Sequence, residues 1–416
     1  MMTGPDDNPT ATIGAGSVAI EGYPRADGRK GIRNVVLVVY LVECAQHVAR
    51  EVANPWREDN VHLIGFPGCY ANAYAARMMR ELCTHPNVGA VLLVSLGCEG
   101  FDRAALAETI AESGRPVETL VIQESGGTRR TVDAGRRWVE QARGDIAGVT
   151  RVAMQPSELI VATICGGSDA TSGVTANPAV GRAFDALVRD GVTCIFEETG
   201  ELIGCEHHMA SRAVTEELAQ MLVGSVAKAA RYYQSYGQAS FAPGNADGGL
   251  TTIEEKSLGA YCKSGTAPIS GLIKPGDRPT RGGLYLLDVV PDGEPKFGLP
   301  NITDNAEIVE LMACGAHLTL FTTGRGSVVG SAIAPVIKIC ANPDTYRQLS
   351  DDMDVNAGRI LEGRATVDEV GEEIHQLALE VAAGRPTASE SLGHREFLLT
   401  YKSFEPIGPA CLPTVG

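Results

Sequence analysis

The sequence predicts an α/β protein whose sheets are mainly parallel and are built from repeated βα units. Short apolar runs of strand length, such as "VVLVVYLV" from Val35, alternate with amphipathic stretches of helix length. Strands of a parallel sheet are buried between helices on both faces, so they read as near-continuous apolar runs. The 416 residues are enough for two to three such lobes.

The expected elements follow one another regularly in the first part of the chain. Strands at 35–42, 61–66, 88–97 and 117–123 alternate with helices at 44–53, 73–83, 103–113 and 131–143. The pattern resumes with a strand at 158–164, a helix at 180–191, a strand at 192–198 and a helix at 213–236. Further strands are expected within 283–291, 316–323 and 334–343, followed by a helix at 366–384. We therefore expect a flexible leader at 1–20, α/β lobes at 21–150 and 151–242, and a C-terminal catalytic lobe with Gly-rich loops at 243–416.

Composition narrows the class of partner. The chain carries 35 basic and 51 acidic residues, and this balance argues against nucleic acid or an anionic membrane surface as a partner. Its apolar runs are of strand length, and its first residues lack the charge and apolar pattern of a signal peptide. We expect a cytoplasmic protein that forms an oligomer.

The eleven cysteines are expected to be reduced thiols. Four lie in apolar helical or strand-like runs, where free cysteine usually packs in the core: Cys44, Cys83, Cys194 and Cys340. Three others follow predicted strands, in "GFPGCYANA", "SLGCEGFD" and "ICGGSD": Cys69, Cys98 and Cys165. These three thiols either converge on one metal or iron–sulfur centre, since thiolates suit iron, or merely fill tight turns. Cys205 is a weaker fourth candidate.

The loop after Cys165 suits an anion. Gly166 and Gly167 allow the backbone to approach a ligand closely, and Ser168 offers a hydroxyl donor. Asp169 either caps the next helix or binds a hydroxyl group of a ligand. Asn177 is expected at the start of that helix, with or without a contact to the ligand.

Acidic residues and two histidines gather in the stretch "EETGELIGCEHH". They are Glu197, Glu198, Glu201, Glu206, His207 and His208. Each acid alone is most simply a partner of a helix dipole, whereas the group as a whole can supply an acid, a base or hard metal ligands. The spacing is not that of the HExxH zinc motif.

Two further loops offer charged side chains. "GGLTTIEEKSLG" contains Thr252, Glu254, Glu255 and Lys256, which form either a solvated helix start or a functional loop with a desolvated lysine. In "TTGRGS", Arg325 between glycines is suited to a bidentate grip on a carboxylate.

Several of these stretches together resemble one family. "GYPRADGRKGIRN", "GC", "GCE", "CGGSDATSGVTANPAVGR", "PGNADGGLTTIEEKSLG", "TGRGS" and "IKICAN" resemble, in this order, the altronate/galactarate dehydratase family of hydro-lyases. The resemblance covers nearly the whole chain from Gly22. It implies a family-specific, non-Rossmann α/β architecture and an association with iron, as Fe²⁺ or an iron–sulfur cluster, with Mn²⁺ as a substitute.

The family resemblance also implies a partner. Family members often begin with a small β-rich SAF domain, whereas this sequence resembles the large catalytic subunit of two-component members. A separate small SAF-domain subunit is therefore expected.

The resulting hypothesis is dehydration of a sugar acid to a 2-keto-3-deoxy acid. Elimination of water needs a base beside the proton next to the carboxylate and a cation for the developing charge. The residues expected to act are Lys256, Glu255, Glu206 and Asp169 in catalysis, Gly166, Gly167, Ser168, Asn177, Thr252 and Arg325 in substrate binding, and Cys69, Cys98 and Cys165 as metal ligands. The alternatives are the large subunit of a sulfolactate sulfo-lyase, which releases sulfite, and a non-catalytic subunit that binds a sugar acid.

Overall fold

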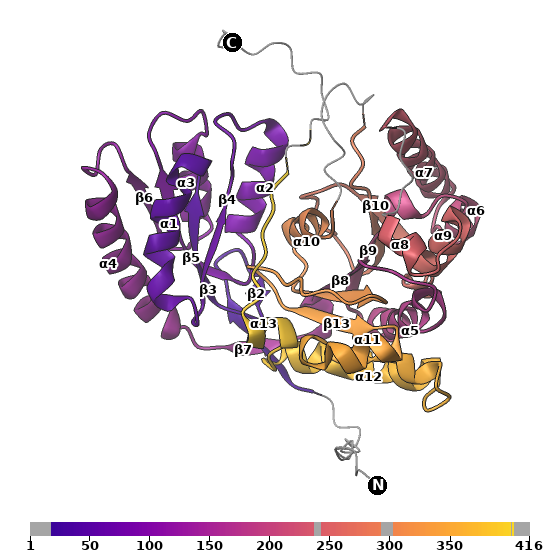
Figure 1. Cartoon of the computed structure of the whole chain (residues 1–416). Helices are drawn as coiled ribbons and strands as arrows, with labels where there is room; N and C mark the ends of the chain where they lie inside the picture. The colour runs from indigo at the N-terminus through magenta and orange to yellow at the C-terminus, as the bar shows by residue number, and fades with distance from the viewer. Residues whose placement is uncertain (1–17, 237–242, 293–302, 401, 403–416) are drawn as a thin grey trace.

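The computed structural model describes residues 18–236, 243–292, 303–400 and 402. Residues 1–17 of the predicted leader lie outside this part of the chain. Two parallel sheets form the framework, each packed against helices, and the C-terminal segment runs between the two lobes (Figure 1). The α/β class with mainly parallel sheets is therefore confirmed.

The first lobe is a four-stranded sheet with helices on both faces. It consists of β3 (Val35–Tyr40), β4 (Val61–Gly65), β5 (Val88–Ser95) and β6 (Val117–Val121), with α1 (Gln46–Ala53), α2 (Ala73–Cys83), α3 (Arg103–Glu112) and α4 (Thr128–Ala147). The spatial order is β4-β3-β5-β6, and all neighbours are parallel. Alternate residues of β3 face opposite sides: Val36 and Val38 pack with α1 and α4, and Leu37 and Val39 pack with α2 and α3.

The second lobe is a seven-stranded parallel sheet in the order β10-β11-β9-β8-β12-β13-β14. Its strands are β8 (Ile160–Cys165), β9 (Thr193–Glu197), β10 (Ile269–Ile273), β11 (Gly283–Leu287), β12 (Leu318–Thr323), β13 (Val336–Cys340) and β14 (Val355–Asn356). Strands from both the 151–242 and the 243–416 portions of the chain thus pair in one sheet. One face of this sheet packs on α5 (Ala176–Arg189), α7 (Glu216–Tyr236) and α12 (Val367–Ala382), and the other on α10 (Asp304–Ala313).

Smaller elements complete the fold. The remaining helices are α6 (Glu206–Ala210), α8 (Pro243–Asp247), α9 (Ile253–Cys262), α11 (Pro343–Gln348) and α13 (Ala388–Leu392). A small antiparallel sheet consists of β1 (Ile20–Pro24), β2 (Lys30–Gly31) and β7 (Val152–Met154). In the described part of the chain, no helix has the length and apolar character needed to cross a membrane.

The prediction that four cysteines pack in the core is right for three of them and wrong for Cys44. Cys83, Cys194 and Cys340 are buried, but Cys44 is exposed. The helix predicted to begin at Cys44 begins instead at Gln46, after a 3-10 turn over Glu43–Ala45. Cys44 therefore lies in the loop that leaves β3 and not on the buried face of α1.

The two lobes share one apolar core and a buried ion pair. Apolar residues of α2 in the first lobe and of α10 in the second belong to the same buried cluster. Beside it, the ammonium group of Lys402 lies 2.7 and 2.9 Å from the carboxylate oxygens of Glu310, which also accepts a hydrogen bond from Tyr74 of α2. The carbonyl of Lys402 accepts a hydrogen bond from Asn72 at the start of α2. This pair therefore ties the C-terminal segment to both lobes.

Removing one member of this ion pair should destabilise the protein strongly. Lys402→Met or Glu310→Leu leaves the other charge buried without its partner, and we expect each to lower the free energy of unfolding by about 3–5 kcal/mol. The double variant Lys402→Met/Glu310→Leu should lose much less than the sum, because no lone charge stays buried. Urea unfolding of the four proteins tests this, and additive losses would show that the two charges do not stabilise each other.

Candidate functional site

The site begins where β8 ends at Cys165. Apart from Thr163, the side chains of β8 before this thiol are apolar, and the two glycines that follow let the chain turn beside the start of helix α10. A Cβ atom at Gly166 would lie 1.9 Å from Oδ2 of Asp304, so only glycine allows this close approach. The loop therefore brings a buried thiol and the first acidic residue of α10 to the carboxyl edge of the sheet, where ligands bind in open α/β folds.

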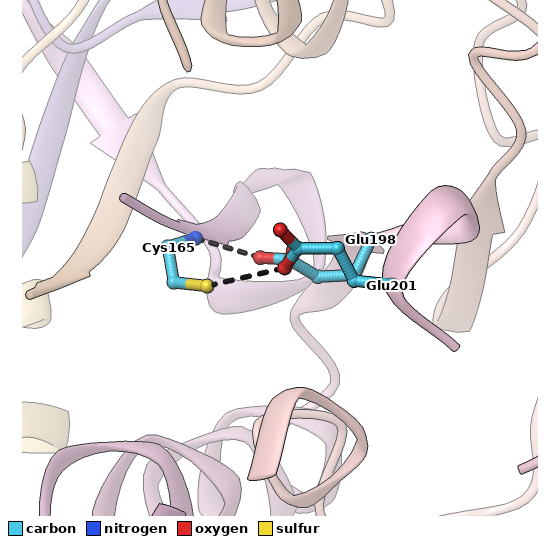
Figure 2. A group of neighbouring side chains, drawn as sticks. All are labelled: Cys165, Glu198 and Glu201. Carbon is cyan, nitrogen blue, oxygen red and sulfur yellow. Dashed lines mark hydrogen bonds between the residues drawn. The ribbon is translucent and has the colours of Figure 1, made fainter. Parts of the chain in front are cut away.

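Two glutamates from the end of the adjacent strand β9 reach this thiol. Figure 2 shows Cys165, Glu198 and Glu201 turned toward one another. The backbone N–H of Cys165 donates to Oε1 of Glu198 at 2.7 Å, and the thiol lies 3.7 Å from Oε2 of Glu201. Glu198 is almost fully buried, whereas 20% of the Glu201 side chain is exposed, so Glu201 is the acid that a molecule in solution can reach.

Two lysines from one face of α9 complete the buried group. The ammonium nitrogen of Lys256 lies 2.9 Å from the Cys165 sulfur, 3.0 Å from the Ser168 hydroxyl and 2.5 Å from Oε2 of Glu201. Lys263, seven positions further along, forms an ion pair with Glu198. Residues seven apart lie on the same side of a helix, so α9 presents both cations to the carboxyl ends of β8 and β9.

Burial and these charges separate the protonation states of the two glutamates. Burial raises the pKa of Glu198, but the charges of Lys263 and Lys256 outweigh it and bring that pKa to about 2. Burial is also the largest effect on Glu201, and together with the nearby Glu198 it raises the pKa of Glu201 to about 8 against the opposing charge of Lys256. Glu198 is thus a permanent anion, and Glu201 exchanges a proton close to neutral pH.

The thiol and the lysine are both protonated at neutral pH. Burial, reinforced by Glu198, raises the pKa of the Cys165 thiol to about 12. Burial lowers the pKa of Lys256, yet the neighbouring Cys165, Glu201 and Glu198 together raise it well above its ordinary value. At neutral pH the charged acid near Lys256 is Glu198, because Glu201 is mostly protonated below pH 8. The group therefore offers a fixed cation next to a titrating carboxyl group.

Asp169 and Asn177 hold the site's loops in place. Oδ1 of Asp169 accepts from the backbone N–H of Thr171 at 2.9 Å, and Oδ2 accepts from the side chain of Asn342 at 3.0 Å. Asn177 donates to the carbonyl of Gly259 in α9 at 3.0 Å and accepts from Thr322 of β12 at 2.8 Å. These contacts are with the protein itself, so the structure places both residues in support of the loops.

Arg325 lies beside the Cys165 loop. Its backbone N–H donates to the carbonyl of Gly167 at 2.8 Å, and its guanidinium group donates to the carbonyl of Gly244. The side chain is exposed, and no ion pair to Arg325 occurs among the described residues. Its guanidinium group is thus accessible to an anion from solution.

Three other predicted site residues lie at helix starts. Thr252 is the N-cap of α9 and accepts from the backbone N–H of Glu255 at 3.2 Å, and Glu255 in turn accepts from Thr251. Glu206 accepts from the backbone N–H of Gly204 at the start of α6. Thr252 and Glu255 are exposed and Glu206 is half-buried, and their bonds are those of helix caps.

Sequence reasoning missed Lys263 and Asp304. Lys263 follows Lys256 by seven residues on the predicted helix face, a spacing that could have identified it. Asp304 carries no such signal, because its place beside Gly166 depends on the packing of α10 against the sheet. Burial is the main reason that the pKa of Asp304 is raised to about 6.

The sequence predicts metal binding by Cys69, Cys98 and Cys165. Cys69 and Cys98 are exposed in the loops after β4 and β5 of the first lobe, and they do not join Cys165 in a group of metal-ligand type within the described residues. Instead, the ligand atoms of Cys165, Glu198 and Glu201 lie within 4.8 Å of one another, which makes these residues a candidate metal-binding group.

The surroundings of this group fit a cation poorly. Thiolate and carboxylate groups are acceptable iron ligands. However, Lys256 and Lys263 already pair with the two carboxylates, and the pKa of the Cys165 thiol is about 12. A metal ion here would lie beside two ammonium groups, so we assign it no step at this position.

The fold and the site define the class of protein. A buried lysine, a thiol and carboxyl groups with shifted pKa values at the carboxyl edge of a parallel sheet form a candidate enzyme site in an α/β protein. Residues 22–147 match the family model "D-galactarate dehydratase/Altronate hydrolase, second domain", and residues 156–404 match "D-galactarate/Altronate dehydratase, C-terminal". The chain belongs to this family.

Curated relatives agree with this assignment. The chain is 34% identical to (2R)-sulfolactate sulfo-lyase subunit beta of Chromohalobacter salexigens, over 91% of this chain and 96% of the relative. It is also 34% identical to galactarate dehydratase (L-threo-forming) of Escherichia coli, over 88% and 73%, and 30% identical to altronate dehydratase of Bacillus subtilis, over 96% and 80%. All three names describe lyases, and the chain is a lyase.

Proposed function

We propose that this chain eliminates water from a sugar acid to give a 2-keto-3-deoxy acid. The observation that carries the proposal is the position of Lys256, whose ammonium group is within hydrogen-bond reach of Cys165, Ser168 and Glu201. A fixed cation next to a carboxyl group that titrates near neutral pH is what abstraction of a weakly acidic C–H proton requires.

The first step removes the proton from C2, the carbon next to the substrate carboxylate. The exposed part of Glu201 takes this proton, and the Lys256 ammonium group stabilises the negative charge that develops on the carboxylate oxygens. Arg325 and the Gly166–Ser168 loop are the groups that bind and orient the carboxylate, because they offer an accessible guanidinium group and a glycine turn with a hydroxyl group beside Lys256.

The second step expels the group on C3 with the electron pair left by the C2 proton. When that group is hydroxide it leaves as water, and the enol that forms rearranges to the 2-keto acid. Asp304, which packs against Gly166 and has a pKa raised to about 6, is a further acid that can protonate the departing hydroxide. The number of protons is conserved, because Glu201 takes one proton from C2 and Asp304 gives one proton to the hydroxide.

A second candidate is elimination of sulfite from sulfolactate. It uses the same proton abstraction at C2 and differs in the group that leaves C3. The observation in its favour is similarity: the chain is 34% identical to the sulfo-lyase subunit beta over 91% of this chain and 96% of that relative. That relative is named as one subunit, so we also propose that this chain works with a separate small subunit.

Product analysis distinguishes these functions. The purified chain, alone and together with a small subunit from the same source, is incubated with galactarate, altronate or sulfolactate. A 2-keto-3-deoxy acid from a sugar acid supports the dehydratase, and free sulfite from sulfolactate supports the sulfo-lyase. Tight binding of one acid without any product would instead identify a non-catalytic binding subunit.

Cys165→Ala should lower kcat by about tenfold to a hundredfold, because Lys256 loses a partner that helps fix its ammonium group. Cys165→Ser keeps a hydrogen-bonding atom in this place and should recover most of the lost rate. Steady-state kinetics of the two variants, with their melting temperatures, test this. Full activity of Cys165→Ala would remove the thiol from the site's chemistry.

A further inference from the structure

A pocket of about 500 Å³ lies between the first lobe and the C-terminal segment, and no residue of the Lys256 site lines it. One wall comes mainly from α1, β4 and the turn between them, and the other from residues 392–397. Because β4 is an edge strand in the order β4-β3-β5-β6, its outer side needs a cover. The C-terminal segment, which runs between the two lobes (Figure 1), lies across from it and leaves a pocket of the size that small-molecule ligands occupy.

The charge of this pocket is positive. Its described lining residues include three arginines, Arg50, Arg57 and Arg395, and one acid, Glu58. Arg57 and Glu58 form an exposed ion pair at 2.9 Å and offset each other. Arg50 and Arg395 remain as cations, on a chain whose net charge is −16. Two cations gathered at one pocket of an acidic protein favour an anion as the ligand.

The acids around Arg395 do not pair with it. Each of the three forms an ion pair with another arginine: Glu58 with Arg57 at 2.9 Å, Asp59 with Arg143 at 2.7 Å and Glu390 with Arg33 at 2.6 Å. The guanidinium group of Arg395 donates to the backbone carbonyls of Arg57 and Asp59 and forms no ion pair with any described residue. Burial lowers the pKa of Arg395 in spite of the three acids, so this pocket wall holds a partly desolvated cation without an anionic partner.

Arg50 stands on the facing wall, in the last turn of α1. Its side chain is exposed and has no hydrogen bond or ion pair within the part of the chain that the structure describes. The guanidinium group can therefore turn to a ligand without breaking another contact. Two arginines on opposite walls suit a carboxylate or phosphate group, whose oxygens accept paired hydrogen bonds from guanidinium groups.

His62 adds a hydrogen-bond acceptor to the same wall. Its Nδ1 lies 2.5 Å from the carbonyl of Ala332, and because a carbonyl only accepts, Nδ1 carries the ring proton. Burial lowers the pKa of His62 to about 4, so the ring is neutral and Nε2 is an acceptor. This buried Nε2 has no hydrogen-bond partner among the described residues. A hydroxyl or N–H group of a ligand would supply one.

Apolar side chains complete the lining. Leu392 is 48% exposed although it lines the pocket, and Leu63 and Phe397 are half-buried there. A sugar acid carries hydroxyl groups along its whole length and does not match such a surface. The lining therefore fits a ligand with an acidic group at one end and an apolar part at the other.

We propose that this pocket binds a small organic acid at a site separate from the Lys256 site. The carboxylate or phosphate group of the ligand binds Arg50 and Arg395, and its apolar part contacts Leu392 and Phe397. The ligand thereby joins the first lobe to the C-terminal segment. Because only the folded chain forms the pocket, binding also raises the melting temperature.

Binding of simple probes to the full chain tests this proposal without a turnover assay. Phenylacetate and phenyl phosphate carry both parts of the ligand, inorganic phosphate carries only the charge, and benzyl alcohol carries only the apolar ring. Ligand-observed NMR titrations at low salt measure the four affinities. We expect one of the two aromatic acids to bind at least about tenfold more tightly than inorganic phosphate or benzyl alcohol, and the tighter acid shows whether the site prefers carboxylate or phosphate.

Variants locate the bound acid. Arg50→Gln and Arg395→Gln should each weaken its binding by about tenfold or more, because each removes a charged donor. Arg189→Gln, at the exposed end of α5 in the other lobe, is the matched control and should bind like the wild type. Lys256→Met should also keep full affinity, since its side chain is not part of the pocket. Melting temperatures confirm that each variant is folded, and Arg50→Gln removes a side chain without contacts to the described protein.

The same titrations can overturn the proposal. Absence of binding by both aromatic acids at millimolar concentration would exclude the site. Wild-type affinity in both Arg50→Gln and Arg395→Gln would remove the arginines from it, and equal affinities for benzyl alcohol and the acids would show that charge is not recognised. Loss of binding in Lys256→Met with full binding in Arg395→Gln would place the acid at the Lys256 site instead.

Discussion

Lys256→Met should reduce kcat by about a thousandfold. The substitution keeps the length of the side chain but removes the ammonium group that contacts Cys165, Ser168 and Glu201. Loss of a single neutral donor to a developing negative charge costs a hundredfold to a thousandfold in known enzymes, and a buried cation contributes at least as much. Steady-state kinetics with the accepted hydroxy acid measure the effect.

The control for this experiment is another lysine from a buried ion cluster. Lys228 on α7 pairs with Asp288 and Asp292 and also donates to the carbonyl of Val290, none of which belongs to the Lys256 group, and only 15% of its side chain is exposed. Lys228→Met should lower the melting temperature but leave kcat per folded molecule nearly unchanged. Equal losses of kcat in the two variants would mean that Lys256 acts through stability and not through the reaction.

Glu201→Gln should lower kcat by about a hundredfold to ten-thousandfold and should change the pH profile. Glutamine keeps the shape of the side chain but cannot accept the C2 proton, and a well-placed general base contributes a factor of this size. Since the pKa of Glu201 is raised to about 8, its carboxyl group is mostly protonated at pH 7. The wild-type rate should therefore rise with pH, about tenfold per unit below pH 8, and level off above it.

The residual activity of Glu201→Gln should lack this rise. Glu217→Gln on the exposed start of α7 makes the same chemical change outside the site and should keep both the rate and the profile of the wild type. A wild-type rate that is flat between pH 6 and pH 9, or a Glu201→Gln profile that still rises through pH 8, would assign the base to another group.

The fold could be predicted from the sequence because its strands are short, apolar and regularly spaced. The strand expected at 88–97 is β5 (Val88–Ser95), in which every residue is buried, as a strand of a parallel sheet should be. The pairing of β8 and β9 with β10–β14 in one sheet was not predictable in the same way. Which strands pair with each other depends on contacts between residues far apart in the sequence, and the apolar pattern along the chain does not specify those contacts.

Three residues that the sequence singles out are brought together by the structure. Cys165, Ser168 and Lys256 lie in contact, because a strand end and a helix face with unusual polar residues are both visible in the pattern. Local sequence could not separate Glu201, which reaches this group, from Glu255 and Glu206, which cap helices. All three are acids near a helix start, and only tertiary packing decides which one is enclosed.

The most direct test of the account is the fate of the C2 hydrogen. The accepted hydroxy acid is converted in D₂O by the wild-type chain and by Glu201→Gln, and the product is examined by NMR. Proton abstraction by Glu201 predicts a 2-keto acid that carries solvent deuterium at C3 and none of the original C2 hydrogen, with strongly slowed formation in the variant. Equal rates of product formation in the two proteins would contradict it.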